Sequence, residues 1–257
     1  MIRLFSSLCM ALFCSVSVGS AVTLDWSAVT WTAGSLSNSY DIDPSNPGSD
    51  IMIAMSGNTG NFNSGSPSIG TGLGGTGKSS LQLAPTFTST SQSITVTISF
   101  NYTQGVYLQN LNILSVDSGT IVLAGYTDKI TNIVGVTATG QSVNAAAVAG
   151  GSSVTVSGNS TSGWTASGNG TVAGTSANGN VSVSFGNFRV KQVSFTLSNS
   201  GNLSISLASQ LIGLDNIGYS LTPEVQPGII GAVLCGLALV GELWRDCQKR
   251  RGSKAPG

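Results

Sequence analysis

Hydrophobic and polar residues alternate along much of this chain, and the alternation is clearest over residues 93–102. One face of that segment carries the hydrophobic residues Ile94, Val96, Ile98, Phe100 and Tyr102. Serine, threonine and asparagine occupy the positions between them. A period of two places one set of side chains in a core and the other set in water. The segment therefore predicts a half-buried antiparallel strand.

Shorter hydrophobic runs on both sides of this segment predict further strands, separated by residues typical of turns. These strands are expected at residues 22–26, 51–55, 106–116, 120–126, 129–138, 154–156, 181–185, 190–197, 203–207 and 211–221. Asp117, Ser118 and Gly119 predict a tight turn, and the Gly-, Ser- and Asn-rich residues 56–80 predict one long loop. None of this region shows the period of a long amphipathic helix.

The number and length of these strands indicate the fold class. Many short strands joined by polar turns are typical of all-β proteins. We therefore expect residues 22–222, called the body below, to form a two-sheet antiparallel sandwich of the jelly-roll kind. A β-solenoid is the alternative fold, and the irregular spacing of the strands disfavours it.

Residues 1–21 have the three parts of a secretory signal peptide. Arg3 supplies the positive charge, residues 4–18 are apolar or small, and residues 19–21 are small enough to precede a cleavage site. All four cysteines lie in the two apolar ends of the chain, at positions 9, 14, 235 and 247. The exported body is thus expected to contain no disulfide, catalytic thiol or thiolate metal site.

Residues 223–257 combine a polar break, an apolar run and a basic end. The break consists of Pro223, Glu224, Val225, Gln226 and Pro227. Residues 228–244 predict a C-terminal hydrophobic, transmembrane helix, slightly shorter than the ~20 residues of a typical span. Residues 245–257 form the basic end, in which Arg245, Lys249, Arg250 and Arg251 make up the basic stop. Because such charges stay on the cytoplasmic side of a membrane, we expect the body to lie outside the cytoplasm.

This ending resembles the PEP-CTERM sorting signal of Gram-negative bacteria, in which a Pro-Glu-Pro motif precedes a membrane helix and an Arg-rich end. Pro223 and Glu224 match the first two motif positions, and Val225 stands where the second proline is usual. Residues 214–220, with their Asp-Asn-Ile sequence, resemble the strand that often precedes such a signal. The resemblance implies processing by an exosortase, transient residence in the inner membrane, delivery to the outer surface or medium, and an association with exopolysaccharide.

The charge content of the chain excludes several functions. Charged residues make up only 8% of the sequence, Lys and Arg balance Asp and Glu, and histidine is absent. Without a basic field to hold phosphates, the chain is not expected to bind nucleic acid. Without histidine, the usual Ser-His-Asp and Cys-His catalytic arrangements are excluded. The aspartates of the body are more simply turn residues than a carboxylate pair for glycoside hydrolysis, so we expect no enzymatic activity.

Gly72 to Ser79 matches the pattern of a phosphate-binding P-loop. That motif needs a buried strand before it and a helix after it. Here the flanking residues, with serine and proline before the motif and a strand-like run after it, predict neither. We therefore reject nucleotide binding as a function of this loop.

Asp41, Asp43 and Ser45 resemble the start of a calcium-binding loop, in which oxygen ligands occupy alternate positions. Further along, Asn46 replaces the glycine of such loops and Met52 replaces the bidentate glutamate. An Asx-type turn explains the segment more simply. We therefore expect no cofactor, with a structural calcium ion as the alternative.

Trp164 follows Ser162 and Gly163 in a context typical of a loop. An exposed tryptophan can stack on a sugar ring, which makes Trp164 the candidate glycan contact. The alternative is a tryptophan folded onto the sheet.

These features together predict an exported cell-surface or biofilm-matrix protein with a non-enzymatic, structural or adhesive role in the envelope or in exopolysaccharide. A carbohydrate-binding module is the second hypothesis. A surface glycan hydrolase is the third.

Overall fold

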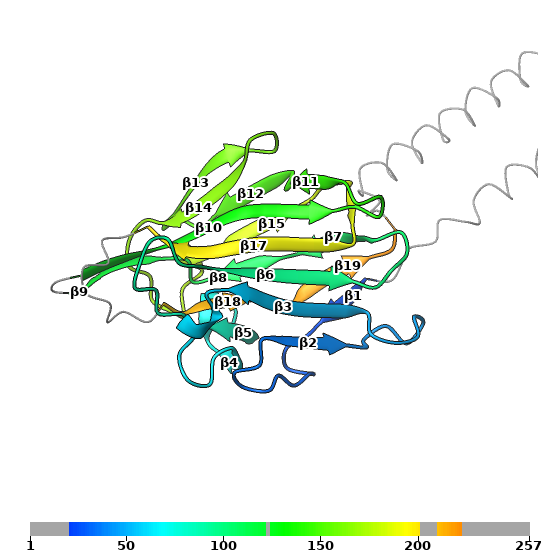
Figure 1. Ribbon diagram of the computed structural model, residues 1–257, viewed down its shortest axis with the longest axis horizontal. Helices are drawn as coiled ribbons and strands as arrows, with labels where there is room; N and C mark the ends of the chain where they lie inside the picture. Colours follow the sequence, from blue (N-terminus) through cyan, green and yellow to red (C-terminus); the bar gives the residue numbers. More distant parts are fainter. Residues whose placement is uncertain (1–20, 122–123, 201–209, 223–257) are drawn as a thin grey trace, which may run out of the picture. The chain divides into compact units, whose positions relative to one another are not determined.

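The computed structural model describes residues 21–121, 124–200 and 210–222, and its strands are labelled in Figure 1. These residues belong to one of two units of the chain, residues 1–222 and residues 223–257. The expected signal peptide apart from Ala21, the strand at 203–207 and the sorting tail lie outside the described residues. The described part is all-β, and its helical residues form three short 3-10 turns, η1 (Thr59–Asn61), η2 (Leu73–Gly75) and η3 (Ala177–Gly179).

One side of the fold is a sheet to which the described residues contribute nine strands. Its main path runs through β13 (Val154–Asn159), β14 (Gly163–Gly168), β10 (Ala124–Val136), β17 (Gln192–Asn199), β6 (Ser93–Phe100), β3 (Ile51–Gly57) and β2 (Ser37–Tyr40). Two further strands, β9 (Ser118–Ile121) and β11 (Ser142–Asn144), pair with β10. Figure 1 shows these long strands lying side by side.

Two smaller sheets of the described region form the other side. The first contains β1 (Val22–Leu24), β19 (Ile217–Ser220), β7 (Val106–Asn110) and β16 (Arg189–Val190). The second contains β12 (Ala147–Gly150), β15 (Val181–Ser184), β8 (Asn112–Leu114), β18 (Ile212–Leu214), β5 (Ser79–Leu83) and β4 (Ser68–Thr71). All pairings between described strands are antiparallel, which confirms the antiparallel prediction and provides none of the parallel stacking of a β-helix.

The two small sheets are joined by two stretches of chain that run through both. Strands β7 and β8 are separated by Leu111 alone, and β18 and β19 are separated by Asp215 and Asn216. Within one small sheet β19 pairs with β7, and within the other β18 pairs with β8. The two breaks therefore lie next to each other, and together the small sheets cover the large one as in a sandwich.

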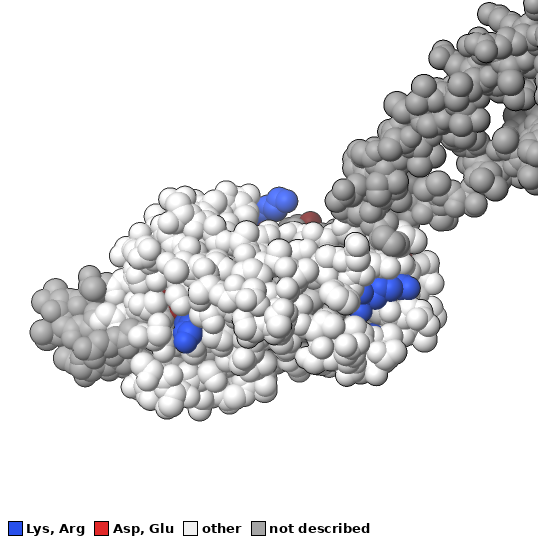
Figure 2. Space-filling model, turned by 90° about the horizontal axis from the view of Figure 1, so that it is seen from above, with Lys and Arg blue, Asp and Glu red and all other residues white. Residues whose placement is uncertain are grey.

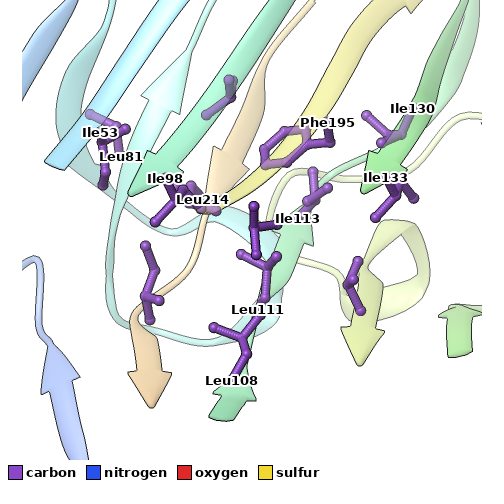
Figure 3. Packing of buried hydrophobic residues seen from close by; sticks show 14 of the residues in the cluster. Ile53, Leu81, Ile98, Leu108, Leu111, Ile113, Ile130, Ile133, Phe195 and Leu214 are labelled. Atoms are coloured by element: carbon purple, nitrogen blue, oxygen red, sulfur yellow. The ribbon is translucent and has the colours of Figure 1, made fainter. Parts of the chain in front are cut away.

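The core is one continuous hydrophobic cluster between the two sides. Figure 3 shows its centre, where Ile53, Ile98, Ile130, Ile133 and Phe195 of the large sheet meet Leu81, Leu108, Leu111, Ile113 and Leu214 from the other side. Burying such side chains contributes roughly 1.5–3 kcal/mol each, which is the main favourable term in folding.

Strand β6 confirms the pattern from which the fold was predicted. Its even-numbered residues, from Ile94 to Phe100, are buried, and the intervening Ser and Thr residues are partly exposed. Strand β10 departs from simple alternation, because its register with β17 shifts between Thr131 and Val134. Asn132 there has φ of 51°, a left-handed conformation that asparagine tolerates. The irregularity lets both Ile130 and Ile133 reach the core.

Two expectations about loops were wrong. Residues 56–80 are not one long loop, because they contain β4, two 3-10 turns and the first residues of β5. Asp117, Ser118 and Gly119 do not form a turn, because β9 begins at Ser118 and pairs with β10 in a hairpin. In both places strand pairing, which depends on distant residues, overrides local turn propensity.

The polar pair Asp215–Asn216, at the break between β18 and β19, ties the two ends of the body together. The Asn216 side-chain oxygen accepts the Trp26 main-chain N–H at 3.0 Å, and its amide nitrogen donates to Asp25 at 3.3 Å. The Trp26 indole N–H donates to the Asp215 carbonyl oxygen at 3.0 Å, and Asn112 donates to the Asp215 carboxylate at 3.2 Å. We call this arrangement the terminal latch.

Replacing Asn216 by alanine should destabilise the body, because the buried N–H of Trp26 would lose its partner. The expected loss is about 1–3 kcal/mol in the free energy of unfolding. Denaturant unfolding of the full chain, followed by circular dichroism, measures it.

The matched control is Asn187→Ala, since Asn187 is exposed. Equal stability of the two variants would show that the Asn216 side chain contributes nothing to the stability of the body.

Candidate functional site

The predicted sorting motif, Pro223, Glu224 and Val225, lies outside the described residues. The predicted basic stop, Arg245 and residues 249–251, lies outside them too. Among the residues that the structure does describe, no helix is both long enough and apolar enough to cross a membrane.

Trp164 lies in strand β14 and not in a loop. Its ring is half-buried and packs against the core cluster. The indole N–H donates to the main-chain oxygen of Ala145 at 2.8 Å. One face of the ring and its only donor are therefore already used within the body, which leaves only a partly exposed surface for a sugar.

The P-loop-like residues Gly72 to Ser79 connect two antiparallel strands, β4 and β5. A strand rather than a helix follows the glycines, as expected from the sequence. The Gly74 N–H donates to Gly174 at 2.7 Å, and its carbonyl accepts from Asn180 at 2.8 Å. A side chain at Gly74 would lie 2.7 Å from the Asn180 side-chain oxygen. Gly74 and Gly75 therefore allow close packing against residues 174–180.

The calcium-like segment forms part of a buried acidic cluster with Tyr102. Asp43 accepts from the main-chain N–H and the hydroxyl of Ser45, which closes the Asx-type turn. Asp50 accepts two main-chain N–H groups, those of Ile42 and Asp43, both at 2.6 Å. The Tyr102 hydroxyl lies 3.0 Å from the Asp43 carboxylate and 3.3 Å from that of Asp50.

Hydrogen bonds from protein groups thus occupy the carboxylate oxygens of Asp43 and Asp50. In the part of the chain that is described, no group of three or more His, Cys, Asp or Glu side chains could hold a metal ion. The arrangement supports the Asx-type turn and gives no support to a calcium site at Asp41 and Asp43.

The electrostatics of this cluster follow from its burial and hydrogen bonds. The bonds from Ser45 lower the pKa of Asp43 and outweigh the opposing effect of burial. Burial raises the pKa of Tyr102 far above the usual tyrosine value, and hydrogen bonds to Tyr219 and Asp43 raise it further. Burial also raises the pKa of Tyr219 to about 12. The phenols therefore remain neutral donors next to the two carboxylates.

A second buried acidic pair, Asp117 and Asp128, was not recognised from the sequence. Asp128 is fully buried and Asp117 is 7% exposed. The Asp117 main-chain N–H donates to the Asp128 carboxylate at 3.1 Å. No local sequence signal identifies the pair, because its members lie on different segments and meet only when β9 and β10 pair.

Burial of acids leaves the surface of the body almost uncharged. The described residues contain seven aspartates and no glutamate, and five of the aspartates are buried, namely Asp43, Asp50, Asp117, Asp128 and Asp215. In Figure 2 isolated Lys and Arg side chains stand on a face that is otherwise nearly free of charge.

The outward side of the large sheet carries an array of uncharged polar side chains, which we call the hydroxyl face. It consists of Ser93, Thr95, Thr97 and Ser99 on β6 and Gln192, Ser194, Thr196 and Ser198 on β17. The two strands pair so that Thr95 lies opposite Thr196 and Thr97 lies opposite Ser194. The hydroxyls of Thr95 and Thr196 are 3.2 Å apart, within hydrogen-bond distance.

The sequence matches no protein-family model, and no match is found among curated proteins or among solved structures.

The Tyr102→Phe variant should lose about 1–3 kcal/mol of stability at neutral pH, because buried carboxylate oxygens lose a donor. The folded-state pKa of Tyr102 is raised, so its contribution is complete below the unfolded phenol pKa of about 10 and falls at higher pH. Denaturant unfolding of the full chain at pH 7 and above pH 10 measures both effects.

Tyr107→Phe is the control, because it also removes one phenol hydroxyl but keeps the ring that lies 5.4 Å from the Arg189 guanidinium carbon. If the two variants lost equal stability, the proposed role of the Tyr102 hydroxyl would be wrong.

Proposed function

We propose that this chain is an exported protein of the bacterial cell surface or extracellular matrix, with a non-enzymatic structural or adhesive role in envelope or exopolysaccharide material. Its C-terminal segment, with Pro223, Glu224 and Val225, acts as a PEP-CTERM-like signal for an exosortase-type enzyme. The basic residues Arg245, Lys249, Arg250 and Arg251 hold the tail in the inner membrane until processing.

The observation that carries the adhesive role is the hydroxyl face on an almost uncharged body. Each Ser or Thr hydroxyl can both donate and accept, and sugar hydroxyls have the same capacity. At the centre of this face, contact between two such surfaces, directly or through bridging water, strips no charge of its hydration, because the charged residue of the neighbouring strand, Lys129, lies opposite Ser198 at one end of the face. Thr95, Thr97, Ser194 and Thr196 lie at the centre of this face and are its expected main contacts.

A structural rather than catalytic role is supported by the environment of the acids. Asp43 and Asp50 accept hydrogen bonds from turn residues and from Tyr102. Asp215 belongs to the terminal latch. These carboxylates close turns and join segments of the body.

We propose that the finer architecture of the body is a jelly-roll-like pair of sheets, followed by a C-terminal hydrophobic helix.

A carbohydrate-binding module centred on Trp164 is the second candidate function. It is favoured by the partial exposure of the Trp164 ring on β14, next to the outermost strand β13. It is disfavoured by the indole N–H bond to Ala145, which leaves stacking as the ring's main means of contact.

Sorting is tested by intact mass and cell fractionation of the chain in its native host. The mature protein should begin near residue 22, end near Pro223 and occur at the outer surface or in the medium. Replacing Pro223 and Glu224 by alanine should retain the full C-terminus in the inner membrane, whereas Gln226→Ala should be processed normally. A wild-type chain that keeps its tail in the inner membrane would contradict the sorting proposal.

Adhesion is tested by retention of the full chain on purified exopolysaccharide from the producing strain. The Thr97→Lys/Thr196→Lys double variant should be retained about tenfold less, equal to about 1.4 kcal/mol, because lysine places a hydrated charge against a neutral partner.

Thr32→Lys, at an exposed position away from the hydroxyl face, is the control for added charge. If the double variant were retained as well as the wild type and Trp164→Ala were not retained, the result would contradict the adhesive role of the hydroxyl face. It would favour the carbohydrate-binding module centred on Trp164.

A further inference from the structure

The acidic pair Asp117–Asp128 lies at the base of the hairpin formed by β9 and β10. The Asp128 N–H donates to the Asp117 carbonyl oxygen at 2.9 Å, and the Asp117 N–H donates to the Asp128 carboxylate at 3.1 Å. The next pair up the hairpin is Ser118 opposite Thr127. In Figure 1 this hairpin extends beyond the neighbouring strands of the large sheet. The two side chains therefore occupy the point where the hairpin joins the body.

The same two carboxyl groups connect the hairpin to distant segments. The Asp117 carboxylate accepts the main-chain N–H of Val172 at 3.2 Å. The Asp128 carboxylate accepts from the Gln210 side chain at 2.6 Å, and the Gln210 N–H donates to Pro85. Three parts of the chain that are far apart in sequence thus meet at one pair of acids, and Pro85 joins them through Gln210.

Among the described residues, no positive charge acts on Asp128. Among the described segments that contact the acidic pair, the loop at 169–174, the end of β17 and the residues around Pro85 and Gln210 carry no ionisable side chain. The hairpin itself supplies Tyr126, whose pKa is raised by burial and by the nearby Asp117 carboxylate, and Lys129. Lys129 follows Asp128 directly and so projects to the opposite face of the sheet.

We propose, independently of the function proposed above, that Asp117 and Asp128 form a pH-dependent switch that holds the base of the β9–β10 hairpin closed at mildly acidic pH, where the buried Asp128 carboxyl group is protonated. When that proton leaves to solvent, two carboxylates remain at the hairpin base in a buried site without a counter-charge. Their repulsion and loss of hydration loosen the hairpin base.

The direction of the pH effect follows from the burial of Asp128. Burial raises the pKa of Asp128 well above its usual value, and the neighbouring Asp117 carboxylate raises it further, against hydrogen bonds from the Asp117 N–H and Gln210 that lower it. Tyr126 remains neutral in this range, because burial and Asp117 raise its pKa too. The folded chain therefore binds one more proton than the unfolded chain above the usual aspartate pKa, and stability falls as pH rises from there through the folded-state pKa.

The composition of the chain makes this effect measurable. With no histidine in the sequence, no side chain of ordinary pKa titrates between about pH 5 and pH 8. Asp25 and Asp43 have lowered pKa values, so their contribution to folding stability is lost only below this pH range, when acid protonates them. A fall in stability between pH 5 and pH 8 therefore reports on Asp128.

The test compares thermal unfolding of the full wild-type chain with the Asp117→Asn variant between pH 5 and pH 8. The wild-type melting temperature should fall by about 3 °C per pH unit while one proton is released. In Asp117→Asn the neighbouring charge that raises the pKa of Asp128 is removed while the burial of Asp128 remains, so the fall in melting temperature should be smaller and should end at a lower pH than in the wild type. Asp41→Asn, which removes an exposed carboxylate, should behave as the wild type.

Amide hydrogen exchange of the wild type, corrected for the intrinsic effect of pH, provides a second readout that needs no variant. Protection of the Asp117 and Asp128 amides should fall between pH 5 and pH 8 by at least tenfold, while protection in β6 stays high. A constant wild-type melting temperature, or hairpin-base protection that does not change with pH, would overturn the proposal. So would an Asp117→Asn variant that folds and keeps the wild-type pH dependence.

Discussion

The joining of the two ends of the body depends on the polar residues at the break between β18 and β19. Asp215 and Asn216 carry four side-chain polar atoms into a site that is more than 90% buried, so each needs a partner. The partners come from the first strand region, through Asp25 and Trp26, and from the adjacent break, through Asn112. The terminal latch thus lies beside the pairing of β1 with β19, and its bonds link residues of the two small sheets.

Acidic residues are used inside this body where many proteins place them at the surface. Asp43, Asp50 and Tyr102 close a loop, and Asp117 and Asp128 join a hairpin to distant segments. A buried carboxylate is costly unless hydrogen bonds replace its hydration, and main-chain N–H groups supply about half of those bonds here. The exterior is left to hydroxyl and amide groups, which suits contact with a hydrated, uncharged partner. The burial of the aspartates thus accounts for both the internal polar clusters and the nearly uncharged surface.

The sequence predicted those parts of the fold in which pattern and burial agree. Strand β6 and much of β17 show regular alternation, so their core residues and the residues of the hydroxyl face could be located in advance. Strand β4, with the sequence Ser-Ile-Gly-Thr, has no such pattern and is a strand because it pairs with β5. Trp164 was expected in a loop because Ser162 and Gly163, which precede it, are typical of turns. Pairing with β13 instead makes this segment a strand.

The sequence by itself determined the all-β class, the antiparallel strands, the absence of cysteine and histidine from the body and the low charge, because composition and a period of two are properties of the chain alone. Tertiary structure alone decided that Asp117 meets Asp128, that Tyr102 meets Asp43 and Asp50, and that Asn216 binds Trp26. The last pair is separated by 190 positions. Such contacts depend on which strands become neighbours, and that choice follows from the packing of the whole core, which no local pattern encodes.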